Sequence, residues 1–192
     1  MKNADEFKAV KAAVKKELDG ERYQHTIGVA YTCAALAMRY GYSMEDAMLA
    51  GLLHDYAKCI PDDEKLKLCR KYGLPVSEVE QEAPGLLHGR LAAYLSRKEF
   101  DVKNEEILHA IEFHTTGCVG MNLIDKILYV ADFIEPNRKE IPCLEEARRL
   151  CFEDIDRGTL FVLEKSVEYV KSRGKKLDPV TLSALEDCRK RG

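Results

Sequence analysis

The amino-acid sequence predicts an all-α protein, and three observations support this prediction. Apolar residues recur every three or four positions along most of the chain, which is the period of a helix with one buried face. Runs that alternate apolar and polar residues, as strands do, are nearly absent. Several Gly and Pro residues stand at the ends of the periodic segments. With 192 residues, the chain is expected to fold as one domain, 1–192.

Each predicted element follows from its own apolar spacing and its end signals. In the first, Phe7, Val10 and Val14 share one face. Gly73 ends another segment, and Pro179 opens the last at its first position. A helical turn is expected at 77–82. The predicted helices, in order, cover residues 4–18, 22–40, 44–58, 61–72, 86–99, 105–113, 123–134, 143–151, 156–173 and 179–189.

Composition and charge exclude several functional classes. The chain is 46% hydrophobic and 33% charged, with a net charge of −3, so it offers no clustered basic excess for nucleic acid or a membrane surface. The longest uncharged stretch, 26–38, is too short to cross a bilayer. The basic run 171–176 is interpreted as a solvated helix end without a partner. Seven Cys without any CxxC indicate reduced thiols, hence a cytoplasmic protein.

Acidic and histidine side chains stand inside or beside apolar segments. His54 and Asp55 follow the uncharged run 47–53, and His25 begins another such run. Asp132 lies within a helix that is apolar on nearly all sides and is therefore expected to be buried. A buried carboxylate needs a cation or several hydrogen-bond donors.

Each of these residues has an ordinary structural explanation when it is taken alone. A lone buried His is usually a hydrogen-bonded core residue, and Asp132 could pair with an Arg. The recurrence on three apolar helices favours a metal site instead. Two imidazoles and two carboxylates suit Fe, Mn, Co or Zn. Neighbouring residues on a helix point about 100° apart, so water or substrate is expected to complete the coordination.

Two further histidines, His88 and His114, each lie next to a Gly or Thr turn and are candidates for a second metal or for contacts with phosphate. The alternative for His88 is a surface histidine at a helix end. Lys58 lies three residues after Asp55 and is expected on the same helix face; its alternative is a solvated lysine. His109 is interpreted as an ordinary surface or partly buried residue, because it does not share a face with His114.

The order His25, His54-Asp55, Asp132 resembles the HD-domain metal-dependent phosphohydrolase superfamily, and within it the bacterial YqeK family, which is similar to symmetrical dinucleoside tetraphosphate hydrolases. Arg90 departs from this pattern, where a smaller or less charged residue is expected, and this could alter substrate contacts. The matching stretches are RYQHTIGVA (22–30), AGLLHDYAK (50–58), LLHGRLAA (86–93), AIEFHTTG (110–117) and YVADFIEPNR (129–138).

The resemblance implies an HD-domain bundle of about nine to ten helices, with the metal motifs in 22–138 and a C-terminal helical extension at 139–192. It implies symmetrical hydrolysis of diadenosine tetraphosphate to two ADP, with iron, or Mn, Co or Zn, as one or two ions. The implied metal ligands are His25, His54, Asp55 and Asp132, with His88 and His114 for a second ion. The implied catalytic residues are Asp55, Lys58 and His88, and the implied substrate contacts are Gln24, His88, His114, Thr115 and Arg138.

Two alternative functions remain open from the sequence. The same site could serve an HD-type phosphohydrolase of another nucleotide, or the chain could be a catalytically weak module that binds metal and nucleotide. Occupied ligand positions argue against the second. The partner is expected to be a dinucleoside polyphosphate or a nucleotide, with no nucleic acid and no membrane. A homodimer through the C-terminal helices is a further expectation.

Overall fold

The computed structural model describes residues 4–139 and 141–191, and within these ranges the fold is all-α, as predicted. Eleven α-helices and one 3-10 helix are present in the described residues. The sequence predicted ten of these α-helices; the additional one is the five-residue α5, where only a helical turn was expected. The helices are α1 (Ala4–Glu17), α2 (Gly20–Tyr40), α3 (Met44–Leu53), α4 (Asp62–Tyr72), α5 (Glu78–Glu82), η1 (Pro84–Leu87), α6 (His88–Phe100), α7 (Glu105–Phe113), α8 (Leu123–Ile134), α9 (Leu144–Glu153), α10 (Ile155–Ser172) and α11 (Pro179–Arg191).

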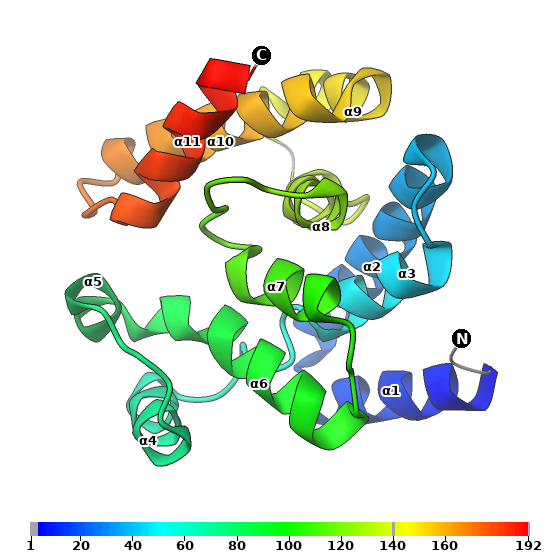
Figure 1. Ribbon diagram of the computed structural model, residues 1–192, viewed down its shortest axis with the longest axis vertical. Coiled ribbons are helices and arrows are strands. Elements are labelled where there is room, and N and C mark those ends of the chain that lie inside the picture. Colours follow the sequence, from blue (N-terminus) through cyan, green and yellow to red (C-terminus); the bar gives the residue numbers. More distant parts are fainter. Residues whose placement is uncertain (1–3, 140, 192) are drawn as a thin grey trace.

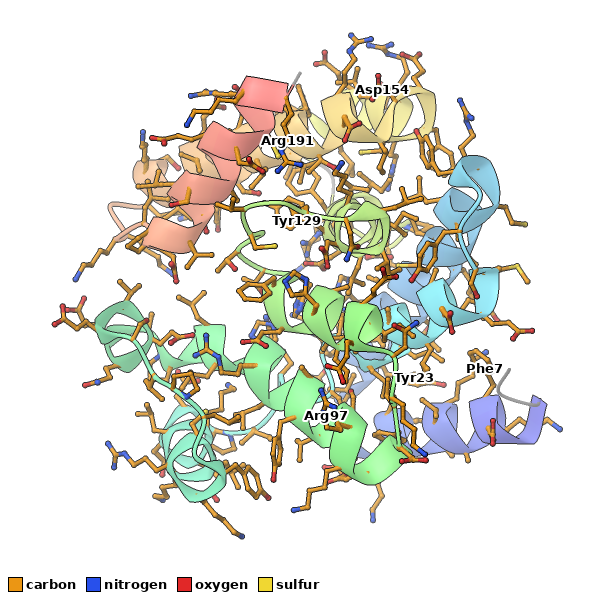
Figure 2. The ribbon with its side chains drawn as sticks, viewed as in Figure 1. Phe7, Tyr23, Arg97, Tyr129, Asp154 and Arg191 are labelled. Carbon is orange, nitrogen blue, oxygen red and sulfur yellow. The ribbon has the colours of Figure 1, made fainter. Side chains whose placement is uncertain are left out.

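Five helices pack against α8, which lies near the middle of the molecule (Figure 1). Helices α2, α3 and α7 contact it from one part of the chain, and α9 and α10 from the other. In Figure 2, Tyr129 marks α8 at the centre, whereas Asp154 marks the corner between α9 and α10 at the periphery. The apolar sequence of α8 explains this position, because a helix that is hydrophobic nearly all round must be covered on most sides.

Close packing of α2 against α3 brings two of the predicted site motifs together. A Cβ atom added to Gly51 would lie 2.7 Å from Ala30 Cα, so this glycine allows the two helix backbones to approach each other. A side chain at that position would push the helices apart, because packed interiors leave no room for an extra methyl group. The contact sets the end of α3, with His54 and Asp55, beside His25 on α2.

The predicted helix 44–58 is wrong at its C-terminal end. Helix α3 ends at Leu53, and the chain then continues in turns in which Tyr56 N donates to Leu53 O and Lys58 N donates to Asp55 O. His54 forms the C-cap of α3, and its Nδ1 atom lies 2.7 Å from Gly51 O. His54 itself keeps helical backbone angles, with φ −56° and ψ −41°, and the regular bonding of the helix is lost after it.

Other end signals act as expected. Ser43 accepts a hydrogen bond from Asp46 N at 3.2 Å, and Gly41 ends α2 with a φ of 74°. Residues 84–87 form the 3-10 helix η1, so α6 begins at His88, two residues later than predicted. Among the described residues, no helix is long and apolar enough to cross a membrane.

Candidate metal centre

Asp55 lies at the centre of a buried group of four histidines. His25 Nε2 and His54 Nε2 lie 3.9 Å and 3.4 Å from one carboxylate oxygen, Oδ2. His88 Nε2 and His114 Nε2 lie 3.1 Å and 3.7 Å from the other oxygen, Oδ1. All five residues are buried. The histidines, which the sequence separates by up to 89 positions (114 minus 25), thus form two pairs around one carboxylate.

Each of these imidazoles is fixed through its Nδ1 atom. In His54, His88 and His114, Nδ1 lies 2.6–2.7 Å from the backbone carbonyl three residues earlier. In His25, Nδ1 lies 3.1 Å from Glu135 Oε1. Because oxygens of this kind accept hydrogen bonds, Nδ1 of each imidazole carries a proton, and Nε2 is the atom left to face a metal ion. Four Nε2 atoms therefore converge on Asp55.

The pair formed by His88 and His114 has its Nε2 atoms 3.1 Å apart. Lys58 Nζ lies 3.1 Å from His88 Nε2. Burial lowers the pKa of His88 to about 4, because the hydrogen bond with Asp55, which raises this pKa, offsets burial only in part and the positive charge of Lys58 lowers the pKa further. His88 is therefore neutral at neutral pH, and its Nε2 atom is available as a ligand or as a proton acceptor.

Asp132, on α8, lies beside the other pair, with Oδ1 3.0 Å from His25 Nε2. Its side chain is 23% exposed, so it stands at the edge of the buried group. Burial raises the pKa of both Asp55 and Asp132, but the neighbouring imidazoles, joined at Asp132 by the Arg138 guanidinium, outweigh this effect and hold both pKa values well below the usual range. The carboxylate of Asp132 in turn helps to raise the pKa of His25, against the lowering by burial. Both acids are ionised at neutral pH.

Three cationic side chains border the carboxylates. Arg22 lies 2.9 Å from Asp55 Oδ2, and Lys58 lies 3.8 Å from Asp55 Oδ1. Arg138 lies 3.7 Å from Asp132 Oδ1. Lys58 and Arg138 were predicted near the site, whereas Arg22 was not, although it lies in the same stretch as His25. Cations at the rim of a buried anionic centre would favour an anionic ligand.

The donors of this centre fit a metal ion. Among the described residues, His25 Nε2, His54 Nε2 and Asp55 Oδ1 are buried side-chain atoms whose close polar contacts lack hydrogen-bond geometry. Leaving such an atom unsatisfied costs about 1–3 kcal/mol, which a bound cation would offset. Imidazole nitrogens and carboxylate oxygens suit Fe, Mn, Co or Zn. Two groups have ligand atoms within 4.8 Å of one another: His25, His54 and Asp55, and Asp55, His88 and His114.

Glu135 is the main site residue that the sequence reasoning missed. It is 1% exposed, and besides its bond to His25 its Oε2 atom accepts from Asn137 N at 2.7 Å. A Cβ atom on Gly28 would lie 2.2 Å from that oxygen, so only glycine leaves room for the carboxylate. From α9, Arg148 donates to the backbone carbonyls of Glu135 and the preceding residue, both at 3.0 Å. The signal in the sequence that could have identified Glu135 is the presence of an acidic residue directly after the most apolar helix.

Two of the predicted substrate contacts differ in their placement. Thr115 Oγ1 lies 3.1 Å from His114 Nε2 and 3.3 Å from His88 Nε2, so it borders the second pair of histidines. Gln24 is exposed, and the contact that links it to the site is made by its backbone carbonyl, which accepts from Asn137 Nδ2 at 3.3 Å. The structure therefore places Thr115, but not the Gln24 side chain, beside the imidazoles.

The two residues set apart by the sequence also have defined positions. Arg90 forms ion pairs with Glu80 at 2.8 Å and Glu112 at 3.0 Å, so its guanidinium joins α6 to α5 and α7. His109 has a side chain that is 42% exposed and lies 2.8 Å from Asp125 Oδ1. It does not approach Asp55, in agreement with its interpretation as a surface or partly buried residue.

We call His25, His54, Asp55, His88, His114 and Asp132 the Asp55 cluster.

Comparisons with known proteins agree with this geometry. The family model for the HD domain matches residues 22–137. A protein of Bacillus subtilis (strain 168) named symmetrical bis(5'-nucleosyl)-tetraphosphatase is 36% identical over 88% of this chain and 90% of its own length. A protein of the same name from Halalkalibacterium halodurans is 37% identical over the same shares.

A solved structure shares the whole fold. It belongs to a predicted HD superfamily hydrolase involved in NAD metabolism from Clostridium acetobutylicum, with a TM-score of 0.93 and 33% identity. The match covers 97% of this chain and 98% of that one, so it includes the C-terminal helices that the family model leaves out. Sequence motifs, site geometry and fold lead to the same conclusion: this chain belongs to the HD-domain family and, within it, to the YqeK family that its motifs resemble.

Proposed function

We propose that the protein is a metal-dependent hydrolase that cleaves diadenosine tetraphosphate symmetrically into two ADP. The observation that carries this proposal is the convergence of four imidazole Nε2 atoms on the two oxygens of Asp55. The names of the relatives from B. subtilis and H. halodurans support the choice of substrate.

The Asp55 cluster divides into two ligand groups. His25, His54 and Asp132 would hold one ion together with Asp55 Oδ2, because these atoms surround that oxygen. His88 and His114 would hold a second ion together with Asp55 Oδ1. A bound ion would lower the pKa of water, so that hydroxide is available as the nucleophile at neutral pH, and would polarise a phosphoryl oxygen.

The residues beside the cluster would act on the polyphosphate. Water would add to one of the two phosphorus atoms beside the central bridging oxygen. The bond from this phosphorus to the bridging oxygen would break, and the second ADP would leave with that oxygen. Lys58, with its Nζ atom next to His88 and Asp55, would stabilise the negative charge that develops on the leaving group. If an ion were bound only by the group of His25, His54 and Asp132, the neutral His88 would accept the proton of the attacking water.

Substrate binding would rely on the cations at the rim. Arg22 and Arg138 each approach a carboxylate of the cluster, and their side chains are 31% and 37% exposed. Guanidinium groups bind phosphate oxygens in a bidentate manner, so these two residues would orient the phosphate chain. Thr115 would donate its hydroxyl proton to a phosphate oxygen near the second pair of histidines. Gln24 remains a proposed nucleotide contact.

Glu135 would position His25 rather than contact substrate. Its carboxylate fixes Nδ1 of His25, and carboxylates in this position orient metal-ligating imidazoles and raise their basicity. Gly28 provides the space for it, and Arg148 holds the backbone of Glu135 from the C-terminal helices. In this proposal residues after 138 support the site, although they contribute no ligand.

The remaining expectations are proposals as well. Iron is our first choice of metal, with Mn, Co or Zn as alternatives and one or two ions. The seven free cysteines support a cytoplasmic location, where thiols stay reduced. Exposed Tyr169, Val180 and Leu182 on α10 and α11 support a homodimer through these helices. The absence of a basic excess argues against nucleic acid as a partner.

The test uses protein purified anaerobically, whose metal content is measured before activity is assayed on the same sample. Protein loaded with iron, manganese or cobalt is expected to release ADP alone from diadenosine tetraphosphate. ATP plus AMP would overturn the symmetrical assignment. A panel that includes NAD and single nucleotides decides whether another substrate is hydrolysed faster, which would favour a different phosphohydrolase. Loss of metal without loss of activity in Asp55→Ala would contradict the mechanism.

A further inference from the structure

A second group of metal-ligating side chains lies outside the Asp55 cluster. His109 on α7, Cys118 in the loop before α8 and Asp125 in the first turn of α8 have ligand atoms within 4.8 Å of one another. His109 Nδ1 lies 2.8 Å from Asp125 Oδ1, and His109 Nε2 lies 4.0 Å from Cys118 Sγ. We call these three residues the His109 cluster. It shares no residue with the Asp55 cluster.

The orientation of His109 in this group is fixed by a carboxylate that is itself held in place. Asp125 is buried, and its Oδ2 atom accepts from Asn122 N at 2.9 Å. Its other oxygen accepts the proton of His109 Nδ1, so the Nε2 lone pair of His109 faces the Cys118 sulfur. This arrangement of carboxylate and imidazole is the one that holds histidine ligands of metals in proteins.

We propose that the His109 cluster binds a borderline or soft divalent cation of the zinc class, with Cys118 Sγ and His109 Nε2 as ligands and Asp125 as the orienting group. Typical zinc bonds of about 2.3 Å to sulfur and about 2.0 Å to nitrogen place the two ligand atoms about 3.5 Å apart in tetrahedral geometry. The observed distance is 4.0 Å, so the two side chains would move slightly toward each other when an ion binds. Binding breaks the S–H bond of Cys118 and releases its proton to water.

The position of the cluster in the fold gives the site a consequence. His109 lies on α7, whose C-cap is His114. Asp125 lies on α8, which also carries Asp132. The loop between them is held to α11, because Gly120 N donates to Asp187 Oδ2 at 2.8 Å. An ion between His109 and Cys118 would tie α7 to this loop. It would therefore restrain two helices that carry residues of the Asp55 cluster.

The presence of sulfur gives this proposal a test that does not involve hydrolysis. Co²⁺ bound to a thiolate shows a charge-transfer absorption in the near ultraviolet, and the Asp55 cluster contains no sulfur. Full-length protein titrated with Co²⁺ is expected to develop this absorption, and Zn²⁺ is expected to remove it by competition. Cys118→Ser is expected to abolish it. His109→Ala is expected to weaken the affinity about tenfold or more.

Cys188→Ser is the matched control, since this half-buried thiol on α11 is near enough to influence Cys118 electrostatically. The absorption is expected to persist in this variant. A wild-type protein without the absorption at saturating Co²⁺, or an absorption that survives Cys118→Ser, overturns the proposal. Loss of the signal in Cys188→Ser alone does so too. Melting curves of the metal-free variants show that each one folds, and no substrate enters the test, so the outcome is independent of the proposed hydrolase activity.

Discussion

The Asp55 cluster and the His109 cluster orient their histidines in the same way but differ in how many histidines they bring together. In both, a histidine donates Nδ1–H to a fixed oxygen and turns Nε2 toward another group. In the Asp55 cluster, four such histidines from separate helices share one buried carboxylate. In the His109 cluster, one partly exposed histidine faces one thiol, and the whole group comes from residues 109–125. The imidazoles of His54, His88 and His114 are therefore oriented within their own turns, whereas the orientation of His25 and His109 and the convergence on one carboxylate require the tertiary fold.

The largest effect is expected for Asp55→Asn, which keeps the shape of the side chain but removes the charge that both ligand groups share. We expect the Asp55 cluster to lose its metal and hydrolysis to fall by about 10³-fold or more, since metal-ion catalysis contributes several kcal/mol and each factor of ten corresponds to about 1.4 kcal/mol. Metal analysis and ADP release measure both quantities.

The same variant tests the independence of the two clusters. The thiolate absorption with Co²⁺ is expected to remain in Asp55→Asn, because Asp55 contributes nothing to the His109 cluster. A parallel loss of both signals would show that the clusters are one coupled unit and would contradict the comparison.

Lys58→Met is expected to separate charge stabilisation from metal binding. The turnover rate should fall by about 10²-fold, as when one donor to a developing negative charge is removed, with the metal content unchanged. Lys67→Met is a matched control, because Lys67 is exposed and pairs with Asp63 away from the site. An unchanged turnover rate in Lys58→Met would leave this lysine as a solvated residue at the rim.

Glu135→Gln is expected to weaken the binding of a metal ion to the ligand group that contains His25 by about 10- to 100-fold. This is the usual effect of removing a carboxylate that is hydrogen-bonded to a histidine ligand. Equilibrium titration with Mn²⁺ or Co²⁺ measures this affinity without reference to activity. The exposed Glu145→Gln provides the control. Equal affinities in the two variants would contradict the positioning role of Glu135.

Gly28→Ala tests the same contact from the other side. Its Cβ atom would displace the Glu135 carboxylate, so metal affinity should fall, and the double variant with Glu135→Gln should show less than the sum of the two effects. Gly20→Ala is the control, since a Cβ atom there meets nothing within 4 Å. Additive effects would mean that the two residues act separately.

The smallest effect concerns stability alone. Asn122 caps α8 by accepting from Asp125 N at 3.1 Å, and Asn122→Ala should lower the free energy of unfolding by about 1 kcal/mol. Urea denaturation measures this change. Hydrolysis and the Co²⁺ absorption should be unchanged, because the bond from His109 to Asp125 does not depend on the Asn122 side chain. A loss of the absorption would show that the cap and the metal ligands are coupled.

Most of the helices were predictable from sequence because their causes are local. Apolar spacing gave α7 and α8 their predicted bounds, and glycine with positive φ ended α2 and α4 where expected. The prediction for α3 was too long because the chain changes to turns after His54, and helical periodicity carries no signal for that change while apolar residues continue. The short α5 lay at the limit of what apolar spacing can indicate.

For the site, the sequence by itself determined which residue types were available and that several were embedded in apolar segments, where an unpaired charge is unfavourable. It did not determine the division of four histidines between the two oxygens of Asp55, nor the pairing of His25 with Glu135 across 110 positions. Those features depend on distances of a few ångströms between helices. Only the packing of α2, α3, α6, α7 and α8 decided them, since a hydrogen bond or ligand contact is lost when a backbone moves by about 1 Å.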